Sequence, residues 1–181
     1  PKEKSHWNTY SERVHYTEKN LQDKHEFVRS RIKQLRPNMV LDLGANDGSF
    51  SLTASPYASS VVSIDRDDQV VNRFYASHRE KTTNILPLVV DITDPSPGRG
   101  WLNRECAPFL QRVNPDVVLC LALLHHLVIS NSIPVDSVVD MLASFNAEVL
   151  LEVRIVLHLN LEGRRISLAH RPGHAHGFHY Y

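Results

Sequence analysis

The sequence is poor in cysteine and lacks any long apolar run. Its two cysteines, Cys106 and Cys120, both lie within apolar stretches, which argues against a secreted fold stapled by disulfides and indicates reduced thiols. No apolar run approaches the roughly 20 residues that are needed to span a bilayer, and no signal peptide opens the chain. We therefore expect a cytoplasmic protein with no membrane partner.

The composition is that of one globular domain with an uneven distribution of charge. The chain has 181 residues, of which 42% are hydrophobic and 22% charged, so it can bury a core without a structural metal. Residues 1–36 carry nine Lys/Arg against five Asp/Glu, residues 37–153 seven against fourteen, and residues 154–181 four against one. Solvated surface explains this distribution, and a basic lid for an anionic substrate is the alternative. The acidic central part argues against a dedicated nucleic-acid surface.

Short apolar runs alternate with helical stretches from residue 37 onward. The expected strands are Met39–Leu43, Val61–Asp65, Ile85–Asp91, Asp116–Ala122 and Glu148–Val153. The expected helices are Asp23–Leu35, Asp68–His78, Trp101–Val113 (interrupted by Pro108) and Pro134–Phe145. This alternation predicts the α/β class: a Rossmann-like, mostly parallel sheet with helices on both faces and a shortened C-terminal part.

We divide this single domain into three segments. Residues 1–36 form an N-terminal lid and helix, residues 37–157 an α/β core, and residues 158–181 a divergent C-terminal hairpin and tail. Within the last segment, Leu157–Leu161 and Arg165–Ala169 can pair as a hairpin, and the remaining residues are typical of a loop. The loop carries four histidines that raise the alternative of a metal site, but an exposed end is favoured: His170, His174, His176 and His179.

The first strand runs into a glycine-containing turn and then a helix. Residues Val40–Phe50 read VLDLGANDGSF, and Gly44 and Gly48 permit a tight turn and a close approach of a ligand to the backbone. Asn46 stands where a dinucleotide-binding protein places its second glycine, which disfavours a pyrophosphate. Asp42 adds a carboxylate near the turn, which favours a cationic ligand. An ordinary strand–turn–helix connection remains the alternative.

The next two strands also end in carboxylates. Asp65 follows the second strand and can accept hydrogen bonds from both hydroxyls of a ribose. Asp91 follows the third strand and can accept from an adenine amino group, while Ile92 packs on the ring. Each aspartate alone is equally explained as a helix N-cap. Carboxylates after three successive strands nevertheless favour one shared cleft.

These residues resemble the cofactor motifs of class I S-adenosylmethionine (SAM)-dependent methyltransferases. Residues 41–50 resemble motif I, Asp65 matches the ribose acid, and Asp91 matches the adenine acid. The segment Leu121–Pro134 is similar to a loop of small bacterial methyltransferases, some of them linked to nodulation or secondary metabolism. The resemblance implies SAM as cofactor and S-adenosyl-L-homocysteine as product. It implies these cofactor contacts: Asp42, Gly44, Asn46, Gly48, Phe50, Asp65, Arg66, Asp91, Ile92 and Leu121.

The acceptor side is expected after the fourth strand. We predict His125 or His126 as a base or orienting group, with His125 preferred, and a backbone-bonded loop histidine is the alternative. The aromatic N-terminal stretch with Trp7, Tyr10 and Tyr16 is interpreted as a lid, or as a segment docked on the core. The favoured partner is a small-molecule acceptor, methylated on oxygen or nitrogen. The alternatives are an RNA or protein acceptor, or a SAM-binding module without catalysis.

Overall fold

The computed structural model describes residues 18–81, 84–152 and 178–180, and six strands within them form one sheet. The strands are β1 (Met39–Leu43), β2 (Ser60–Asp65), β3 (Ile85–Val89), β4 (Val117–Cys120), β5 (Glu148–Leu151) and β6 (Phe178–Tyr180). The helices are α1 (Glu18–Leu35), α2 (Ser49–Ala54), α3 (Asp68–His78), α4 (Phe109–Arg112) and α5 (Val135–Ser144). Short helical turns are η2 (Ser55–Tyr57), η3 (Trp101–Asn103) and η4 (His126–Ser130).

The strand order confirms the predicted Rossmann-like class. The order is β3-β2-β1-β4-β5-β6, and all the paired strands are parallel. The chain adds β2 and β3 on one side of β1 and then returns to add β4 on the other side. In such a sheet the crevice at the carboxyl ends of β1 and β4 is the expected ligand site.

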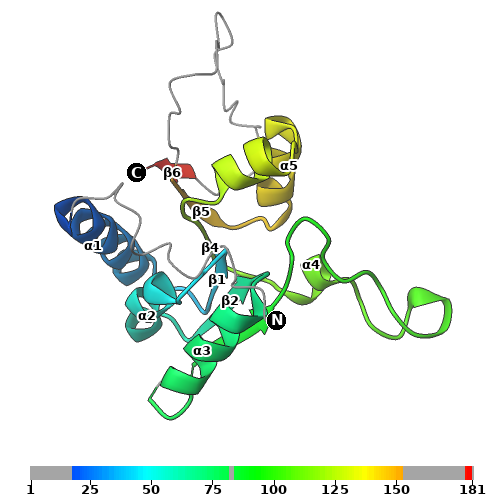
Figure 1. The fold of residues 1–181 in the computed structure, drawn as a ribbon, viewed down its shortest axis with the longest axis horizontal. Coiled ribbons are helices and arrows are strands. Elements are labelled where there is room, and N and C mark those ends of the chain that lie inside the picture. The colour runs from blue at the N-terminus through cyan, green and yellow to red at the C-terminus, as the bar shows by residue number, and fades with distance from the viewer. Residues whose placement is uncertain (1–17, 82–83, 153–177, 181) are drawn as a thin grey trace, which may run out of the picture.

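Helices cover both faces of the sheet, as Figure 1 shows. Alternation along β1 sends Leu41 and Leu43 into a cluster with Val138 and Leu142 of α5. Val40 points to the opposite face and joins the buried side chains that α1 and α2 contribute. The two apolar clusters hold β1 and β4 in the middle of the molecule, so the strand ends that border the crevice are fixed from both sides.

Strand β3 forms an edge of the sheet and carries a proline. The N–H of Val61 donates to the carbonyl oxygen of Asn84 at 2.8 Å. The N–H of Val90 donates to the carbonyl oxygen of Asp65 at 2.9 Å. Backbone groups of the even-numbered residues of β3 therefore face β2, and those of Pro87 face the open edge. Pro87 has no N–H to offer there, which protects the edge against pairing with another strand.

Several predicted elements are confirmed within one or two residues of their bounds. The helix Asp68–His78 is reproduced, and its N-cap Asp67 accepts hydrogen bonds from the N–H groups of Gln69 and Val70. The N-terminal helix begins at Glu18, earlier than predicted, because its polar first turns carry no apolar signal. The first two predicted strands end at the predicted residues, whereas β3, β4 and β5 each end two residues sooner, where the chain turns into the following loops.

The helix predicted over Trp101–Val113 is wrong for most of its length. Trp101–Asn103 forms only a short turn, and the α-helix covers only the four residues Phe109–Arg112. Leu102 has a φ of +54°, which an α-helix does not accommodate. Pro108 then occupies the N-cap position of the short helix, where its missing N–H is tolerated.

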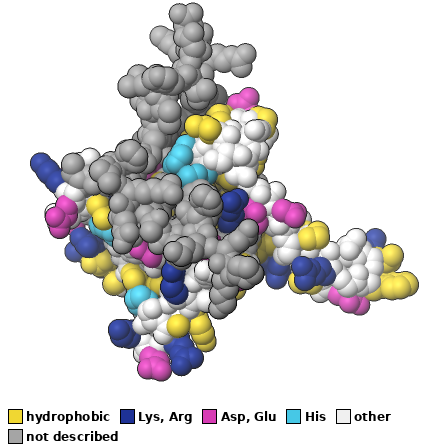
Figure 2. All heavy atoms as spheres, viewed as in Figure 1, with side chains coloured by type: hydrophobic (Ala, Val, Ile, Leu, Met, Phe, Trp, Pro, Cys, Tyr) yellow, Lys and Arg dark blue, Asp and Glu magenta, His cyan; other side chains and the backbone are white. Residues whose placement is uncertain are grey.

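The same segment instead projects from the body of the molecule. Backbone hydrogen bonds in both directions join Arg99 and Cys106 at 2.9 and 3.0 Å and close the base of the projection. Trp101 and Leu102 are 77% and 65% exposed at its tip. Figure 1 shows this projection beyond α4, and Figure 2 shows apolar side chains at its end.

The C-terminal residues differ from the expected loop. Phe178–Tyr180 forms β6, which pairs in parallel with β5. The predicted hairpin of Leu157–Leu161 and Arg165–Ala169 lies outside the described residues, and so does the proposed lid with Trp7, Tyr10 and Tyr16. The division at residues 36 and 157 therefore remains a prediction.

Candidate functional site

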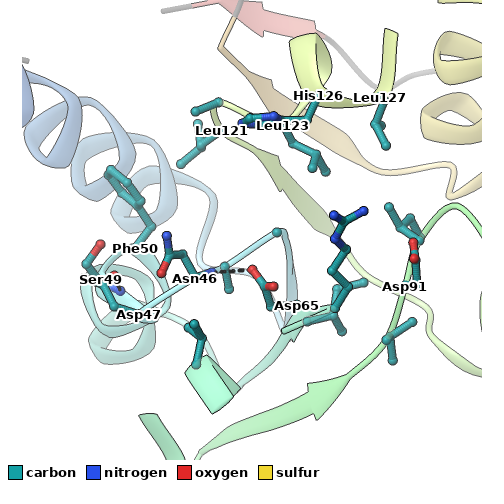
Figure 3. A pocket seen from close by; sticks show the side chains of 18 of the residues that line it. Asn46, Asp47, Ser49, Phe50, Asp65, Asp91, Leu121, Leu123, His126 and Leu127 are labelled. Carbon is teal, nitrogen blue, oxygen red and sulfur yellow. Dashed lines mark hydrogen bonds between the residues drawn. The ribbon is translucent and has the colours of Figure 1, made fainter. Parts of the chain in front are cut away.

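A cavity of about 570 Å³ opens at the carboxyl ends of β1, β2, β3 and β4. Its walls are the turn after β1, the residues after β2 and β3, the segment after β4 and one side of α1, as Figure 3 shows in part. Nine of the predicted site residues line it: Gly44, Asn46, Phe50, Asp65, Arg66, Asp91, Ile92, Leu121 and His126. Three others, Asp42, Gly48 and His125, are not among its lining residues.

The turn after β1 depends on left-handed backbone at two positions. Gly44 has a φ of +68°, and a Cβ added to it would lie only 3.1 Å from Cδ1 of Leu123. Asn46 has a φ of +49°, a region that asparagine tolerates better than most residues. The turn thus brings backbone, rather than bulky side chains, to this part of the cavity wall.

Asp65 connects this turn to the end of β2. Its Oδ2 accepts a hydrogen bond from the N–H of Asn46 and its Oδ1 one from the N–H of Asp67, both at 2.9 Å. Figure 3 shows the bond to Asn46 at the centre of the cavity. A carboxylate oxygen can accept about two hydrogen bonds. Asp65 is therefore held in place by the protein and still has acceptor positions for two donors of a ligand.

Asp91 is fixed in a comparable way after β3. Its Oδ1 accepts from the N–H of Thr93 at 2.9 Å and from the hydroxyl of Thr93 at 2.7 Å. Ile92, next in the chain, also lines the cavity. The structure therefore brings the second and third of the predicted carboxylates to one cavity, with an apolar side chain beside the latter.

Gly48 has a packing role that differs from the predicted cofactor contact. It has a φ of +76°, and a Cβ added to it would lie 2.3 Å from Cζ of Phe74. Phe74 belongs to α3 and is 4% exposed. Gly48 is required because α3 packs its aromatic ring against the entrance of α2.

Asp42 is not among the cavity-lining residues, and its predicted contact with the cofactor stays a prediction. Alternation along β1 places it on the same face as Val40, towards α1 and α2, where the hydroxyl of Ser51 donates to its Oδ2 at 2.6 Å. Asp42 is 2% exposed, and burial raises its pKa to about 6. Its carboxyl group therefore ties β1 to α2 beneath the turn.

Helix α1 contributes a buried ion pair that sequence reasoning missed. Nζ of Lys24 lies 2.5 Å from Oε2 of Glu152, the residue that follows β5. Lys24 is 3% exposed and Glu152 is 5% exposed, yet Lys24 also lines the cavity. Two signals point to this pair: Lys24 falls on the helical stripe of Val28 and Ile32, and Glu152 is one more carboxylate after a strand.

Phe50 lies between two side chains of α1. Its ring stacks on that of His25 with a centroid distance of 4.4 Å and an interplanar angle of 20°. The ammonium group of Lys24 lies 4.5 Å from the centroid of the same ring. All three residues line the cavity, so α1 and α2 together form its wall on this side.

The segment after β4 provides the opposite wall. Leu121, Leu123 and His126 line the cavity, and the rings of His125 and His126 have centroids 4.0 Å apart. Nδ2 of Asn131 donates to the backbone oxygen of His126 at 2.9 Å and steadies the turn η4. Of the two histidines predicted as a base or orienting group, His126 lines the cavity and His125 does not.

Two further sequence expectations concern metals and membranes. Across the described residues, no group of three or more His, Cys, Asp or Glu side chains could hold a metal ion. The tail histidines lie outside these residues, except for the backbone of His179 in β6. No helix in the described part of the chain is long and apolar enough to cross a bilayer.

Comparison with known proteins gives one curated relative. No protein-family model matches the chain. The nodulation protein NoeA of Rhizobium meliloti (strain 1021) is 34% identical over 134 residues, which are 74% of this chain and 28% of that protein. The chain therefore spans little more than a quarter of the length of this relative.

Solved structures share the fold of the described residues. The N-methyltransferase NodS from Bradyrhizobium japonicum WM9, solved in complex with S-adenosyl-L-homocysteine, is 15% identical, with a TM-score of 0.51 over 70% of this chain and 57% of that chain. Monomeric WbdD is 21% identical, with a TM-score of 0.54 over 83% of this chain and 34% of that chain. At these identities the likeness establishes the fold.

Proposed function

We propose that this chain, whose fold is that of the class I SAM-dependent methyltransferases, binds SAM and transfers its methyl group to a small-molecule acceptor. The observation that carries the proposal is the cavity at the switch point of the sheet. There the turn at Gly44 lies beside carboxylates from two successive strand ends, Asp65 and Asp91. The sequence resemblance of residues 41–50 to motif I supports the same cofactor.

The residues around the cavity fit a positively charged nucleoside without phosphates. Asp65 keeps acceptor positions for the ribose hydroxyls, because each of its oxygens accepts only one backbone N–H. Asp91 offers its Oδ2 to the adenine amino group, and Ile92 offers an apolar side chain to the ring. Dinucleotide-binding sites have a glycine at the position of Asn46, where the backbone approaches the pyrophosphate. The side chain of Asn46 therefore disfavours a pyrophosphate at this turn.

The protein's part in the reaction is mainly orientation. When bound, SAM supplies a methyl group that is already activated on a sulfonium, so no residue has to generate the electrophile. Leu121 and Leu123 on one side and Phe50 on the other give the cavity apolar walls against which an acceptor would be oriented.

We propose that His126 is the base that accepts the proton of the methyl acceptor. The imidazole of His126 would take the proton that the acceptor oxygen or nitrogen loses when it is methylated. The assignment rests on the place of His126 in the cavity wall and on the bond from Asn131, which holds its backbone. His125 lies behind it as a ring neighbour.

Titration calorimetry with S-adenosyl-L-homocysteine tests cofactor binding. We expect the wild-type chain to bind and Asp65→Ala to weaken binding by roughly tenfold or more, because hydrogen bonds to a charged group are worth about 1.5–3 kcal/mol each. Asp136→Ala, an exposed acid on α5, is the matched control and should bind as the wild type. Absence of wild-type binding would refute the proposal.

Methyl transfer is tested with labelled SAM and mixtures of metabolites and tRNA. We expect label in a small molecule, with His126→Ala and His126→Gln both slowing transfer by about a hundredfold while binding of S-adenosyl-L-homocysteine persists. Label in tRNA would identify an RNA acceptor instead. Binding without any transfer would favour a SAM-binding module without catalysis.

A further inference from the structure

His25 is a cavity-lining residue that the reaction described above does not use. It lies on α1, half-buried, with its ring stacked on Phe50. Its Nδ1 lies 2.8 Å from the hydroxyl oxygen of Thr53 on α2. The ring is therefore held both by stacking and by one hydrogen bond, and only its remaining nitrogen is open to assignment.

The partners of Thr53 determine which ring nitrogen carries the proton. The hydroxyl of Thr53 donates to the carbonyl oxygen of Ser49 at 3.0 Å. A hydroxyl has one hydrogen, so the same oxygen must accept from Nδ1–H of His25. Reversing the hydroxyl would remove the bond to Ser49 and leave two acceptor oxygens in contact. In the neutral ring the proton is thus on Nδ1, and Nε2 has a bare lone pair.

The surroundings keep the ring neutral. Burial, followed by the nearby positive charges of Arg29 and Lys24 on α1, lowers the pKa of His25, and Asp47 before α2 opposes this in part. A neutral ring with Nδ1 engaged by Thr53 can only accept a hydrogen bond from a molecule in the cavity. It therefore selects an N–H donor and repels a carboxylate at the same position.

We propose that His25 is a ligand-binding residue whose Nε2 accepts a hydrogen bond from the ammonium group at the amino-acid end of the cofactor. This inference rests on the proposed function. The amino-acid end carries one ammonium and one carboxylate group, and the α1 wall of the cavity includes His25, whose ring is stacked on Phe50. Because Lys24 on the same wall is paired with Glu152, Nε2 of His25 is the acceptor that we assign to the ammonium group.

Two variants separate the two nitrogens of His25. The amide of His25→Asn can donate to Thr53 as Nδ1 does, but nothing replaces Nε2. The amide oxygen of His25→Gln reaches the place of Nε2, but the bond to Thr53 is lost. Calorimetry with S-adenosyl-L-homocysteine and with 5′-methylthioadenosine, which lacks the amino-acid end, measures the contribution of that end in each variant. Long-range ¹H–¹⁵N spectra of the wild type report the tautomer.

We expect His25→Asn to weaken binding of S-adenosyl-L-homocysteine by about tenfold, His25→Gln to retain most of it, and 5′-methylthioadenosine to bind all forms alike. A wild-type spectrum with the proton on Nε2 overturns the inference. Equal losses of binding in both variants also overturn it, because they indicate a packing role alone. Unchanged binding in His25→Asn with slower methyl transfer overturns it as well, because it assigns the contact of Nε2 to the acceptor. These results leave the proposed function intact, whereas a wild type that binds no S-adenosyl-L-homocysteine removes both.

Discussion

Replacing Gly48 by alanine tests the packing at the entrance of α2. The new Cβ would lie 2.3 Å from Cζ of Phe74, a distance that the ring cannot tolerate without moving. The φ of +76° is also unfavourable for a residue with a side chain. Both effects act on the folded state, so we expect Gly48→Ala to lower the free energy of unfolding.

The two contributions give an estimate of the loss. Left-handed backbone at a non-glycine residue costs about 1–2 kcal/mol, and overpacking a tight contact costs about 1–3 kcal/mol. We therefore expect a loss of roughly 3 kcal/mol, which for a chain of this size lowers Tm by roughly 6–12 °C. Urea denaturation followed by circular dichroism measures the first quantity, and a thermal scan measures the second.

A double-mutant cycle with Phe74→Leu separates the clash from the backbone strain. The smaller side chain gives the new Cβ room, so Gly48→Ala should cost less in the Phe74→Leu background than in the wild type, by at least about 1 kcal/mol. Ser49→Ala, one residue away and without a clash, is the control. A loss below about 0.5 kcal/mol for Gly48→Ala, or strict additivity in the cycle, would refute the reasoning.

Three further predictions concern buried charge and the edge of the sheet. Burial raises the pKa of Asp42 from 3.8 to about 6, so its contribution to stability is complete below about pH 4 and is lost as the pH rises through 6. In urea titrations, Asp42→Asn should abolish this pH dependence of stability and be more stable than the wild type by about 2–3 kcal/mol at pH 7. Lys24→Met removes the cationic partner of the buried Glu152 and should cost about 3–5 kcal/mol, most of it recovered by adding Glu152→Gln. Equal stability of wild type and Lys24→Met would contradict the buried ion pair. Pro87→Val restores an N–H at the open edge of β3 and should increase self-association in sedimentation runs at rising concentration, whereas a variant as monodisperse as the wild type would show that the edge is protected by other means.

The central sheet and the cavity-lining turn follow from local patterns in the sequence. Strands covered on both faces are continuous apolar runs, so β1, β2 and β4 are visible without any tertiary information. Glycine and asparagine in the turn after β1 mark its left-handed backbone, and a carboxylate after a strand marks the rim of the crevice. This reasoning located Asp65 and Asp91.

The packing roles that local patterns do not reveal depend on contacts between distant segments. Asp42 shares a face with Val40 by simple alternation, but only the position of Ser51 on α2 shows what that face meets. The role of Gly48 requires knowledge of where α3 places Phe74. Segment 101–113 was misjudged because an apolar pattern alone does not report the positive φ of Leu102.

The bond between Lys24 and Glu152 joins residues that are 128 positions apart, and this separation bears on the order of folding. Helix α1 is synthesised first, but its partner emerges from the ribosome only after β1 to β5 have been made. The ion pair that holds Lys24 in the α1 wall of the cavity can therefore form only after that point, although the contacts of α1 with α2 can form earlier. Such late, long-range closure is expected to make maturation of the site slower than collapse of the core.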